Sequence, residues 1–287
     1  MKLFRYGERG QENPGVLLAD GRRIDATGLC QDYDEAFFAG GGLESLQAWI
    51  QTHGDSAPAV PVSTRIGPAV ARPSKIVCIG LNFSDHAQET HMNVPEEPVL
   101  FLKATSALAG AYDDLVIPCD AIKVDWEVEL AFVIGKTATY TSEATALEHV
   151  AGYVLHNDIS ERAFQLERGG QWTKGKGCDG FAPFGPYLVT PDEIPDVNNL
   201  AMWLKVNGHY KQRGTTANML FRIPFLIAYV SRFMTLLPGD IVSTGTPAGV
   251  GLGLKPPQFL RAGDVMEWGI AGLGEARQRV VPHPTQA

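Results

Sequence analysis

Acidic side chains alternate with apolar ones along one stretch near the middle of the chain. Asp125, Glu127 and Glu129 are each separated by one apolar residue, and the apolar run 130–134 follows them. Because neighbouring side chains of a β-strand point to opposite faces, the three carboxylates are predicted to share one face of a strand at 125–134. The pattern predicts either a site for a hard cation such as Mg²⁺, Mn²⁺ or Ca²⁺, or an exposed edge strand that uses charge against aggregation.

A further carboxylate favours the metal hypothesis. Residues 152–156 form a second strand-like apolar run, and Asp158 stands just beyond its end. An aspartate at a strand end can complete a three-carboxylate site with Glu127 and Glu129. Such a site leaves positions on an octahedral ion open for substrate and water. His156, inside the run, is predicted to be a packed core histidine rather than a ligand.

A histidine and a glutamate are candidates for activating water. His86 and Glu89 follow the apolar strand predicted at 75–81, and Ser84 is suited to cap a helix that begins there. Three residues apart on a helix, the two side chains share a face. A carboxylate beside the imidazole raises its basicity, which suits a general base. The alternative is an ordinary surface pair.

Four polar residues further along the chain could contact an anionic substrate. Lys176 lies among glycines and could approach an anion closely, or be a solvated loop lysine. Arg162 and Gln165, three residues apart, could clamp a carboxylate of a metal-held ligand. Thr246 follows a predicted strand, where its hydroxyl could recognise an oxygen atom.

Several common catalytic motifs are absent or incomplete. Residues 170–177 approach a phosphate-binding loop, but Gly177 replaces the hydroxyl residue that binds Mg²⁺, so nucleotide hydrolysis is excluded. Residues 249–253 lack the glycine spacing and the βαβ frame of a dinucleotide site. No G-x-S-x-G and no H-E-x-x-H occurs, which argues against an α/β-hydrolase and a zincin.

Five ordered motifs resemble the fumarylacetoacetate hydrolase superfamily. They are 80–89 (G-L-N-[FY]-x-x-H-A-x-E), 125–131 (D-[WY]-E-x-E-L-A), 157–165 (N-D-[IV]-S-x-R-x-x-Q), 176–186 (K-x-x-D-x-x-x-P-x-G-P) and 243–249 (S-T-G-T-P-x-G). The resemblance implies a mixed β-roll, usually dimeric, that binds Mg²⁺ or Mn²⁺.

The resemblance also implies a role for each matching residue. The metal ligands are Glu127, Glu129 and Asp158, the catalytic residues are His86, Glu89 and Lys176, and the substrate contacts are Arg162, Gln165 and Thr246.

Residues 166–179 look like a subgroup that hydrolyses 2,4-diketo-3-deoxy-L-fuconate or -rhamnonate to pyruvate and L-lactate. The expected activity is therefore hydrolysis of a carbon–carbon bond in a 2,4-diketo acid of the acylpyruvate type. Oxaloacetate decarboxylase, hydroxydienedioate isomerase and ureidoglycolate lyase are the alternatives.

Many short strands and few helices are expected to position these residues. The pattern predicts a β-rich sandwich, barrel or roll in an α+β context. The resemblance implies that this fold is a mixed β-sandwich roll of the fumarylacetoacetate hydrolase type. Residues 1–68 are predicted to form a small N-terminal α+β domain, and 69–287 the catalytic domain. Further strands are expected at 99–103, 115–118, 184–189, 202–206, 240–244 and 264–270, and helices at 43–52, 142–150, 161–167 and 219–236.

The composition limits the partners and the compartment. The formal charge of −8 argues against sequence-independent binding to nucleic acid or to an anionic membrane. No apolar run approaches the roughly 20 residues that span a bilayer, and the start has no stretch suited to a signal peptide. The four cysteines are far apart and are expected to be reduced thiols, with Cys78 in the core. We expect a cytoplasmic homodimer that acts on a small anionic substrate.

Overall fold

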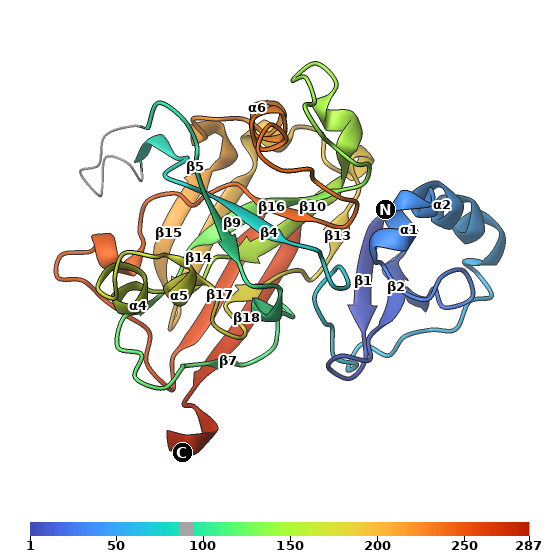
Figure 1. Ribbon diagram of the computed structural model, residues 1–287. Helices are drawn as coiled ribbons and strands as arrows, with labels where there is room; N and C mark the ends of the chain where they lie inside the picture. Colours follow the sequence, from blue (N-terminus) through green and yellow to red (C-terminus); the bar gives the residue numbers. More distant parts are fainter. Residues whose placement is uncertain (86–94, 287) are drawn as a thin grey trace.

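Two mixed β-sheets form the body of the molecule (Figure 1). The structure, a computed structural model, describes residues 1–85 and 95–286. The larger sheet has nine strands in the order β3-β2-β1-β13-β10-β9-β16-β4-β5, and the smaller has five in the order β15-β14-β17-β18-β7. Both sheets combine antiparallel pairs with one parallel pair, β16 with β4 and β18 with β7. The predicted β-rich α+β class is confirmed.

The strands are short, in keeping with the abundance of glycine and proline. They are β1 (Lys2–Tyr6), β2 (Asn13–Leu17), β3 (Arg23–Asp25), β4 (Ile76–Gly80), β5 (Val99–Lys103), β6 (Leu108–Ala109), β7 (Leu115–Val116), β8 (Val124–Asp125), β9 (Val128–Ile134), β10 (Val150–Asn157), β11 (Ser160–Glu161), β12 (Ala182–Pro183), β13 (Leu188–Val189), β14 (Ala201–Val206), β15 (His209–Thr215), β16 (Ile241–Ser243), β17 (Val265–Ile270) and β18 (Gly274–Val281). The α-helices are α1 (Glu35–Ala39), α2 (Gly42–His53), α4 (Arg162–Leu166), α5 (Thr173–Lys176) and α6 (Ile223–Val230).

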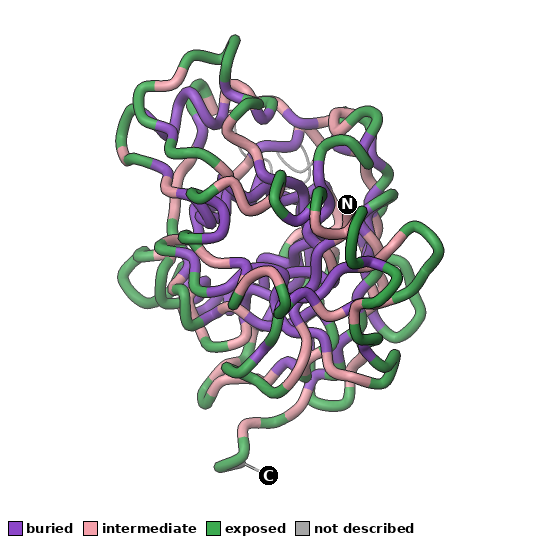
Figure 2. The backbone as a smooth tube through the Cα atoms, turned by 90° about the vertical axis from the view of Figure 1, so that its right-hand side faces the viewer, coloured by how far each residue is buried: buried purple, intermediate pink, exposed green. Residues whose placement is uncertain are grey.

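Strands β9 and β10 pair at the centre of the larger sheet. Every residue of β9 is buried, and β9 also contacts β14 and β17 of the smaller sheet. A strand covered on both faces is expected to be almost continuously apolar, as this one is apart from Glu129. Figure 2 shows this buried centre within an exposed periphery. The alternative of an exposed edge strand is therefore wrong.

The single strand predicted at 125–134 is interrupted. Asp125 belongs to β8, which pairs with β11, whereas Glu129 belongs to β9 in the large sheet. Between them, the backbone N–H of Glu127 donates to the side chain of Asn157 at 2.9 Å, outside any strand ladder. The strict alternation of faces assumed from the sequence therefore does not extend across all three carboxylates.

The N-terminal segments gather on one side of the molecule (blue in Figure 1). They are not a separate sheet, because β1 pairs antiparallel with β13 and so extends the larger sheet. Arg65 donates to Glu12 at 2.9 Å and to Asp113 at 2.7 Å, which ties this region to the loop before β7. The domain boundary at residue 68 stays a prediction.

One predicted helix is wrong and another is predicted too long. Residues 142–150 contain only a 3₁₀ turn, Ala146–His149, and the helix predicted at 219–236 is limited to α6. Pro224 lies in the first turn of α6, where its missing N–H costs nothing, so the helix starts there rather than earlier. The predicted strand at 184–189 is likewise reduced to β13, and the short strand β12 lies just before the predicted range.

Two strands of the smaller sheet were missed from the sequence. Strand β18 alternates exposed and buried residues, a period-two pattern that was available in the sequence. Strand β15 is mostly exposed and polar, and only its pairing with β14 makes it a strand.

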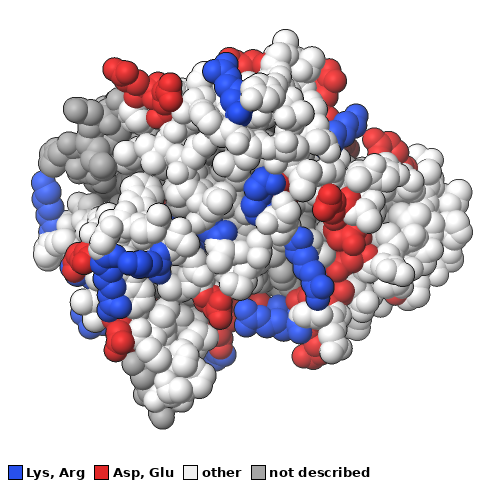
Figure 3. Space-filling model, in the orientation of Figure 1, with Lys and Arg blue, Asp and Glu red and all other residues white. Residues whose placement is uncertain are grey.

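The surface and the thiols agree with the composition. Figure 3 shows acidic and basic side chains interspersed over the face it presents. None of the helices in the described residues has the length and apolar character needed to cross a membrane. All four cysteines are free, and the core position predicted for Cys78 is confirmed. The homodimer and the cytoplasmic location stay predictions.

Candidate active site

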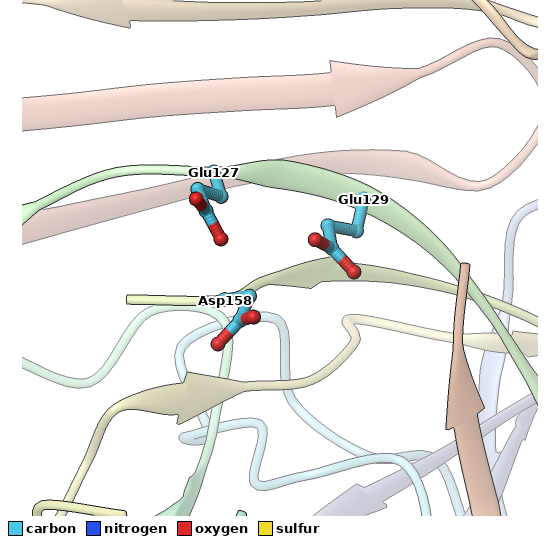
Figure 4. A group of neighbouring side chains, drawn as sticks. All are labelled: Glu127, Glu129 and Asp158. Atoms are coloured by element: carbon cyan, nitrogen blue, oxygen red, sulfur yellow. The ribbon is translucent and has the colours of Figure 1, made fainter. Parts of the chain in front are cut away.

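Three carboxylates converge where β9 begins and β10 ends. Glu127, Glu129 and Asp158 each place an oxygen within 4.8 Å of the others, and all three residues are buried. Figure 4 shows both glutamates directed toward Asp158 on the neighbouring segment. The pairing of His156 with Glu129 across β10 and β9 brings the ends of the two runs together. Burial and the charges of Asp158 and Glu127 raise the pKa of Glu129 well above its ordinary value.

Asp125 does not face this cluster, contrary to the expected alternation. Its carboxylate accepts hydrogen bonds from the backbone N–H groups of Gly251 at 2.6 Å and Leu252 at 3.0 Å. It also accepts from the guanidinium of Arg162 at 2.8 Å. Asp125 thus fastens the loop after β16 to the strand pair, and the break between β8 and β9 is what turns it away.

Two buried lysines compensate the negative charge. The Lys176 ammonium donates to Glu127 at 2.6 Å and to Asp158 at 2.7 Å, and Lys103 donates to the other oxygen of Asp158. Burial alone would raise the pKa of Asp158, but the two ammonium groups outweigh it and hold that pKa below its usual range. Burial disfavours the Lys176 charge, yet Asp158 and Glu127 raise its pKa to about 12. The alternative of a solvated loop lysine is wrong.

A glycine allows Lys176 to reach the carboxylates. Lys176 ends the short helix α5, which packs closely against the segment that starts α4. A Cβ atom on Gly175 would lie 2.4 Å from the carbonyl oxygen of Glu161 and 2.6 Å from the backbone nitrogen of Gln165. Such separations are far inside van der Waals contact, so only glycine permits this approach.

Arg162 binds the protein's own carboxylates. Its guanidinium donates to Asp125 at 2.8 Å, to Glu127 at 2.6 Å and to the side-chain oxygen of Gln165 at 3.1 Å. Arg162 is 6% exposed, so these contacts are shielded from solvent. Arg162 contacts one carboxylate oxygen of Glu127 and Lys176 contacts the other, so the two cations together orient this carboxylate. The substrate contacts predicted for Arg162 and Gln165 stay predictions.

A buried serine and histidine orient Glu129. The hydroxyl of Ser243 donates to one Glu129 carboxylate oxygen at 2.5 Å, and the backbone N–H of Gly245 donates to the same oxygen at 3.0 Å. The Nδ1 atom of His156 lies 2.7 Å from the Ser243 oxygen. Since the single hydroxyl proton is given to Glu129, Nδ1 carries a proton and donates to Ser243. Burial lowers the pKa of His156 to about 3, so the ring is neutral and packed, as predicted.

A cavity of about 190 Å³ opens onto the cluster. All three carboxylates line it, as do Lys176 and Thr246. The Thr246 hydroxyl donates to the carbonyl of Val128 at 2.9 Å and accepts from the Gln212 side chain at 2.7 Å. Seven of the nine site residues predicted from the sequence therefore lie around one cavity. His86 and Glu89 lie outside the described residues, so their role as a water-activating pair stays a prediction.

Sequence reasoning missed three residues that shape this site. Lys103 ends the predicted strand 99–103. A lysine at the end of an apolar strand could have been recognised from the sequence as a candidate site residue. Ser243 and Gln212 carried no such signal, because their partners are distant in sequence. Gln212 accepts from the Val128 backbone N–H at 2.9 Å and thereby joins the two sheets beside the cluster.

Residues 75–281 match the family described as fumarylacetoacetate (FAA) hydrolase, C-terminal. The chain belongs to this family. A Burkholderia lata protein named provisionally as a hydrolase is 50% identical over 97% of this chain and 98% of its own length.

Solved structures of the fumarylacetoacetate hydrolase family share the whole fold. The fumarylacetoacetate hydrolase of Exiguobacterium antarcticum superposes with a TM-score of 0.86 at 36% identity, over 99% of this chain and 100% of that one. Maleylpyruvate hydrolase of Sphingobium sp. SYK-6, solved with manganese(II) and pyruvate, superposes with a TM-score of 0.82 at 29% identity. The match covers 98% of this chain and 99% of that one.

The donor set fits the divalent metal that this family implies. Carboxylate oxygens are the ligands that Mg²⁺ and Mn²⁺ prefer, and the three here are close enough to share one ion. Burial and then the neighbouring charges of Asp158 and Glu127 raise the pKa of Glu129, and a divalent cation would favour its charged form. The residues that would hold it are Glu127, Glu129 and Asp158.

Proposed function

We propose that this enzyme hydrolyses a carbon–carbon bond in a 2,4-diketo acid and needs Mg²⁺ or Mn²⁺ to do so. The observation that carries the proposal is the convergence of three buried carboxylates and the Lys176 ammonium on one small cavity. Such a site can bind a divalent cation at the carboxylates and has the positive charge of Lys176 beside it. A 2-oxo acid substrate, which has a carboxylate next to a carbonyl oxygen, matches both.

The chain's own residues supply charge stabilisation and proton transfer. In the reaction, the hydroxyl of water joins C4, the bond between C3 and C4 breaks, and C3 takes up a proton to become the methyl group of pyruvate. Lys176, which keeps two of its three N–H groups on Glu127 and Asp158, donates the third to the oxygen that becomes negative as the bond breaks. His86, held by Glu89, removes the proton from the attacking water. A bound Mg²⁺ or Mn²⁺ supplies Lewis-acid polarisation and a template for the 2-oxo acid.

The proposed substrates are 2,4-diketo-3-deoxy-L-fuconate and 2,4-diketo-3-deoxy-L-rhamnonate, which give pyruvate and L-lactate. The support is the resemblance of residues 166–179 to the sugar-acid subgroup. These residues run from the end of α4 through α5, and they place Leu166, Trp172 and Lys176 on the cavity. The segment with the subgroup pattern therefore also lines the cavity in which we propose that the substrate binds.

Pyruvate release from a substrate panel tests this function. The panel contains both sugar acids, acetylpyruvate, oxaloacetate and ureidoglycolate, each with Mg²⁺ or Mn²⁺ and with a chelator. We expect metal-dependent pyruvate from the 2,4-diketo acids, with the matching carboxylic acid as the second product. The Glu129→Gln variant should lose metal binding and turnover, whereas Glu275→Gln, an exposed carboxylate on β18, should keep both. Full metal affinity and full turnover in Glu129→Gln would refute the metal assignment.

The same panel separates the alternatives by product. Carbon dioxide with pyruvate from oxaloacetate alone identifies a decarboxylase, and glyoxylate with urea identifies a ureidoglycolate lyase. A hydroxydienedioate that isomerises without taking up water identifies an isomerase. His86→Ala should abolish hydrolysis and leave metal binding intact, because only a reaction with attacking water needs that base. Unchanged hydrolysis in this variant would remove the water-activating role.

A further inference from the structure

Large apolar side chains form much of the cavity lining that is not charged. Phe101 comes from β5, Leu166 ends α4, Trp172 precedes α5 and Leu252 lies in the loop after β16. Three regions far apart in the sequence thus contribute these apolar side chains, two of them from residues 166–172. The cavity therefore has a charged end, at the carboxylates and Lys176, and an apolar wall.

An aromatic pair joins the apolar wall to the charged end. The Phe101 and Trp172 ring centroids are 5.3 Å apart with the planes at 64°, an edge-to-face contact. The Lys176 ammonium lies 4.9 Å from the Phe101 centroid. Phe101 therefore contacts both the ammonium and the Trp172 ring, so the apolar wall begins beside the charged end.

Trp172 is held in this position by the end of β4. A Cβ atom on Gly80 would come within 3.2 Å of the Trp172 ring, which is closer than ordinary van der Waals contact. The indole therefore lies directly on the glycine backbone, where a side chain would displace it. Gly80 at the end of β4 therefore both lines the cavity and fixes the position of the indole.

The wall also includes apolar side chains that remain open to solvent. Leu166 is 48% exposed and Leu252 is 36% exposed, although both line the cavity. A ligand with an apolar end would take this surface out of water, and each buried methylene is worth roughly fourfold in affinity.

The cationic side chains that line the cavity contact the carboxylates at its charged end. Among the described residues that line it, the cationic ones are Arg162 and Lys176. Arg162 donates to three protein side chains, and Lys176 donates to two of the carboxylates. A carboxylate at the far end of a ligand would lie against the apolar wall and lose hydration without gaining an ion pair.

The cavity size limits the ligand further. Its volume of about 190 Å³ is below the roughly 300–1,000 Å³ that is usual for drug-sized sites. A pyruvate unit at the charged end leaves room for only a short acyl group.

We infer that the site selects 2,4-diketo acids whose acyl end is short, uncharged and apolar at its tip, and that Phe101 and Trp172 determine this selectivity. The inference rests on the proposed function for the orientation of the substrate. The proposed sugar acids satisfy it through their terminal methyl group. Maleylpyruvate, after which the Sphingobium enzyme is named, carries a carboxylate at that end and should be a poor substrate here.

Binding of two matched inert acids tests the selectivity apart from turnover. 2-Oxohexanoate and 2-oxoadipate have the same number of carbons and differ in a terminal methyl against a terminal carboxylate. Calorimetry on the Mn²⁺-loaded enzyme should show 2-oxohexanoate binding at least about tenfold more tightly. Equal binding, tighter binding of 2-oxoadipate, or no binding of either acid would overturn the inference.

Variants then assign the selectivity to the aromatic pair. Trp172→Ala should weaken 2-oxohexanoate binding about tenfold and change pyruvate binding less than twofold, because pyruvate reaches only the charged end. Phe101→Leu is a second variant that keeps the wall apolar, and it should weaken 2-oxohexanoate binding less. Trp203→Ala, on β14 and outside the cavity, is the matched control and should change neither affinity. Unchanged 2-oxohexanoate affinity in Trp172→Ala would overturn the role of the pair.

Turnover distinguishes this inference from the proposed function. If no 2,4-diketo acid releases pyruvate, the hydrolase function is wrong, whatever the inert acids show. If maleylpyruvate is cleaved as well as 2,4-dioxohexanoate, the hydrolase function stands and the selectivity is wrong. We expect at least about a tenfold higher kcat/KM for 2,4-dioxohexanoate.

Discussion

Removing the Ser243 hydroxyl should weaken metal binding without touching a ligand. Ser243 donates to Glu129 at 2.5 Å and accepts from the His156 ring at 2.7 Å. The Ser243→Ala variant leaves that Glu129 oxygen with only the Gly245 N–H, and it leaves a buried imidazole N–H without an acceptor. The Glu129 carboxylate is then free to rotate away from the other two carboxylates of the cluster. Part of the free energy of metal binding is therefore needed to hold it in place.

The size of the effect follows from the bond that is lost. A buried hydrogen bond to a charged acceptor contributes about 1.5–3 kcal/mol, which is about 10- to 100-fold in an equilibrium constant. Residues that hold metal ligands by hydrogen bonds commonly affect metal affinity within the same range. Because Gly245 still donates to the carboxylate, we expect the lower end, about tenfold weaker Mn²⁺ binding.

Calorimetric titration of the metal-free enzyme with Mn²⁺ measures this directly. Ser231→Ala is the matched control, since Ser231 is 1% exposed and donates to the carbonyl of Ala228 at 3.1 Å, away from the cavity. It should lower the free energy of unfolding but leave Mn²⁺ affinity unchanged. Ser243→Thr keeps a hydroxyl and should restore most of the affinity. If Ser243→Ala binds Mn²⁺ as tightly as the wild type, the hydrogen-bond chain does not orient Glu129 and the reasoning fails.

Three further outcomes follow from the structure. Lys176→Met should reduce pyruvate release about 10²–10³-fold yet retain or tighten Mn²⁺ binding, because it removes a competing cation; weaker binding by calorimetry would contradict this. Gly175→Ala should lower the free energy of unfolding by about 1–3 kcal/mol in urea, and an unchanged midpoint would refute the close approach of α5 to α4. Burial opposes the charges of Glu12 and Asp113, but Arg65 outweighs it and lowers both pKa values. The pairs therefore stabilise the fold above the ordinary carboxyl pKa, and this stability is lost as pH falls below about 4. Arg65→Met should flatten the pH dependence of thermal unfolding there, and an unaltered pH profile would count against the pairs.

Local patterns predicted the strands that carry or flank the three candidate metal-binding carboxylates. The runs before Asp158 and after Glu129 are apolar because β9 and β10 are buried at the centre of the sheet. Hydrophobicity and spacing report burial directly, so these elements and their terminal carboxylates were accessible from the sequence. The helices at 142–150 and 219–236 were overextended because helical propensity is weak against tertiary packing and a first-turn proline.

The sequence by itself determined the family and indicated the three candidate metal-binding carboxylates, since residue types and motif order are properties of the chain. Which partner each charged group has was decided only by the tertiary structure. Lys103 and Asp158 are 55 positions apart and Ser243 and Glu129 are 114 apart, and no periodicity links such pairs. Asp125 turns from the cluster to Arg162 because the chain breaks between β8 and β9. Electrostatic energies depend on distance and burial in space, so the charge balance of the site exists only once the sheets have packed.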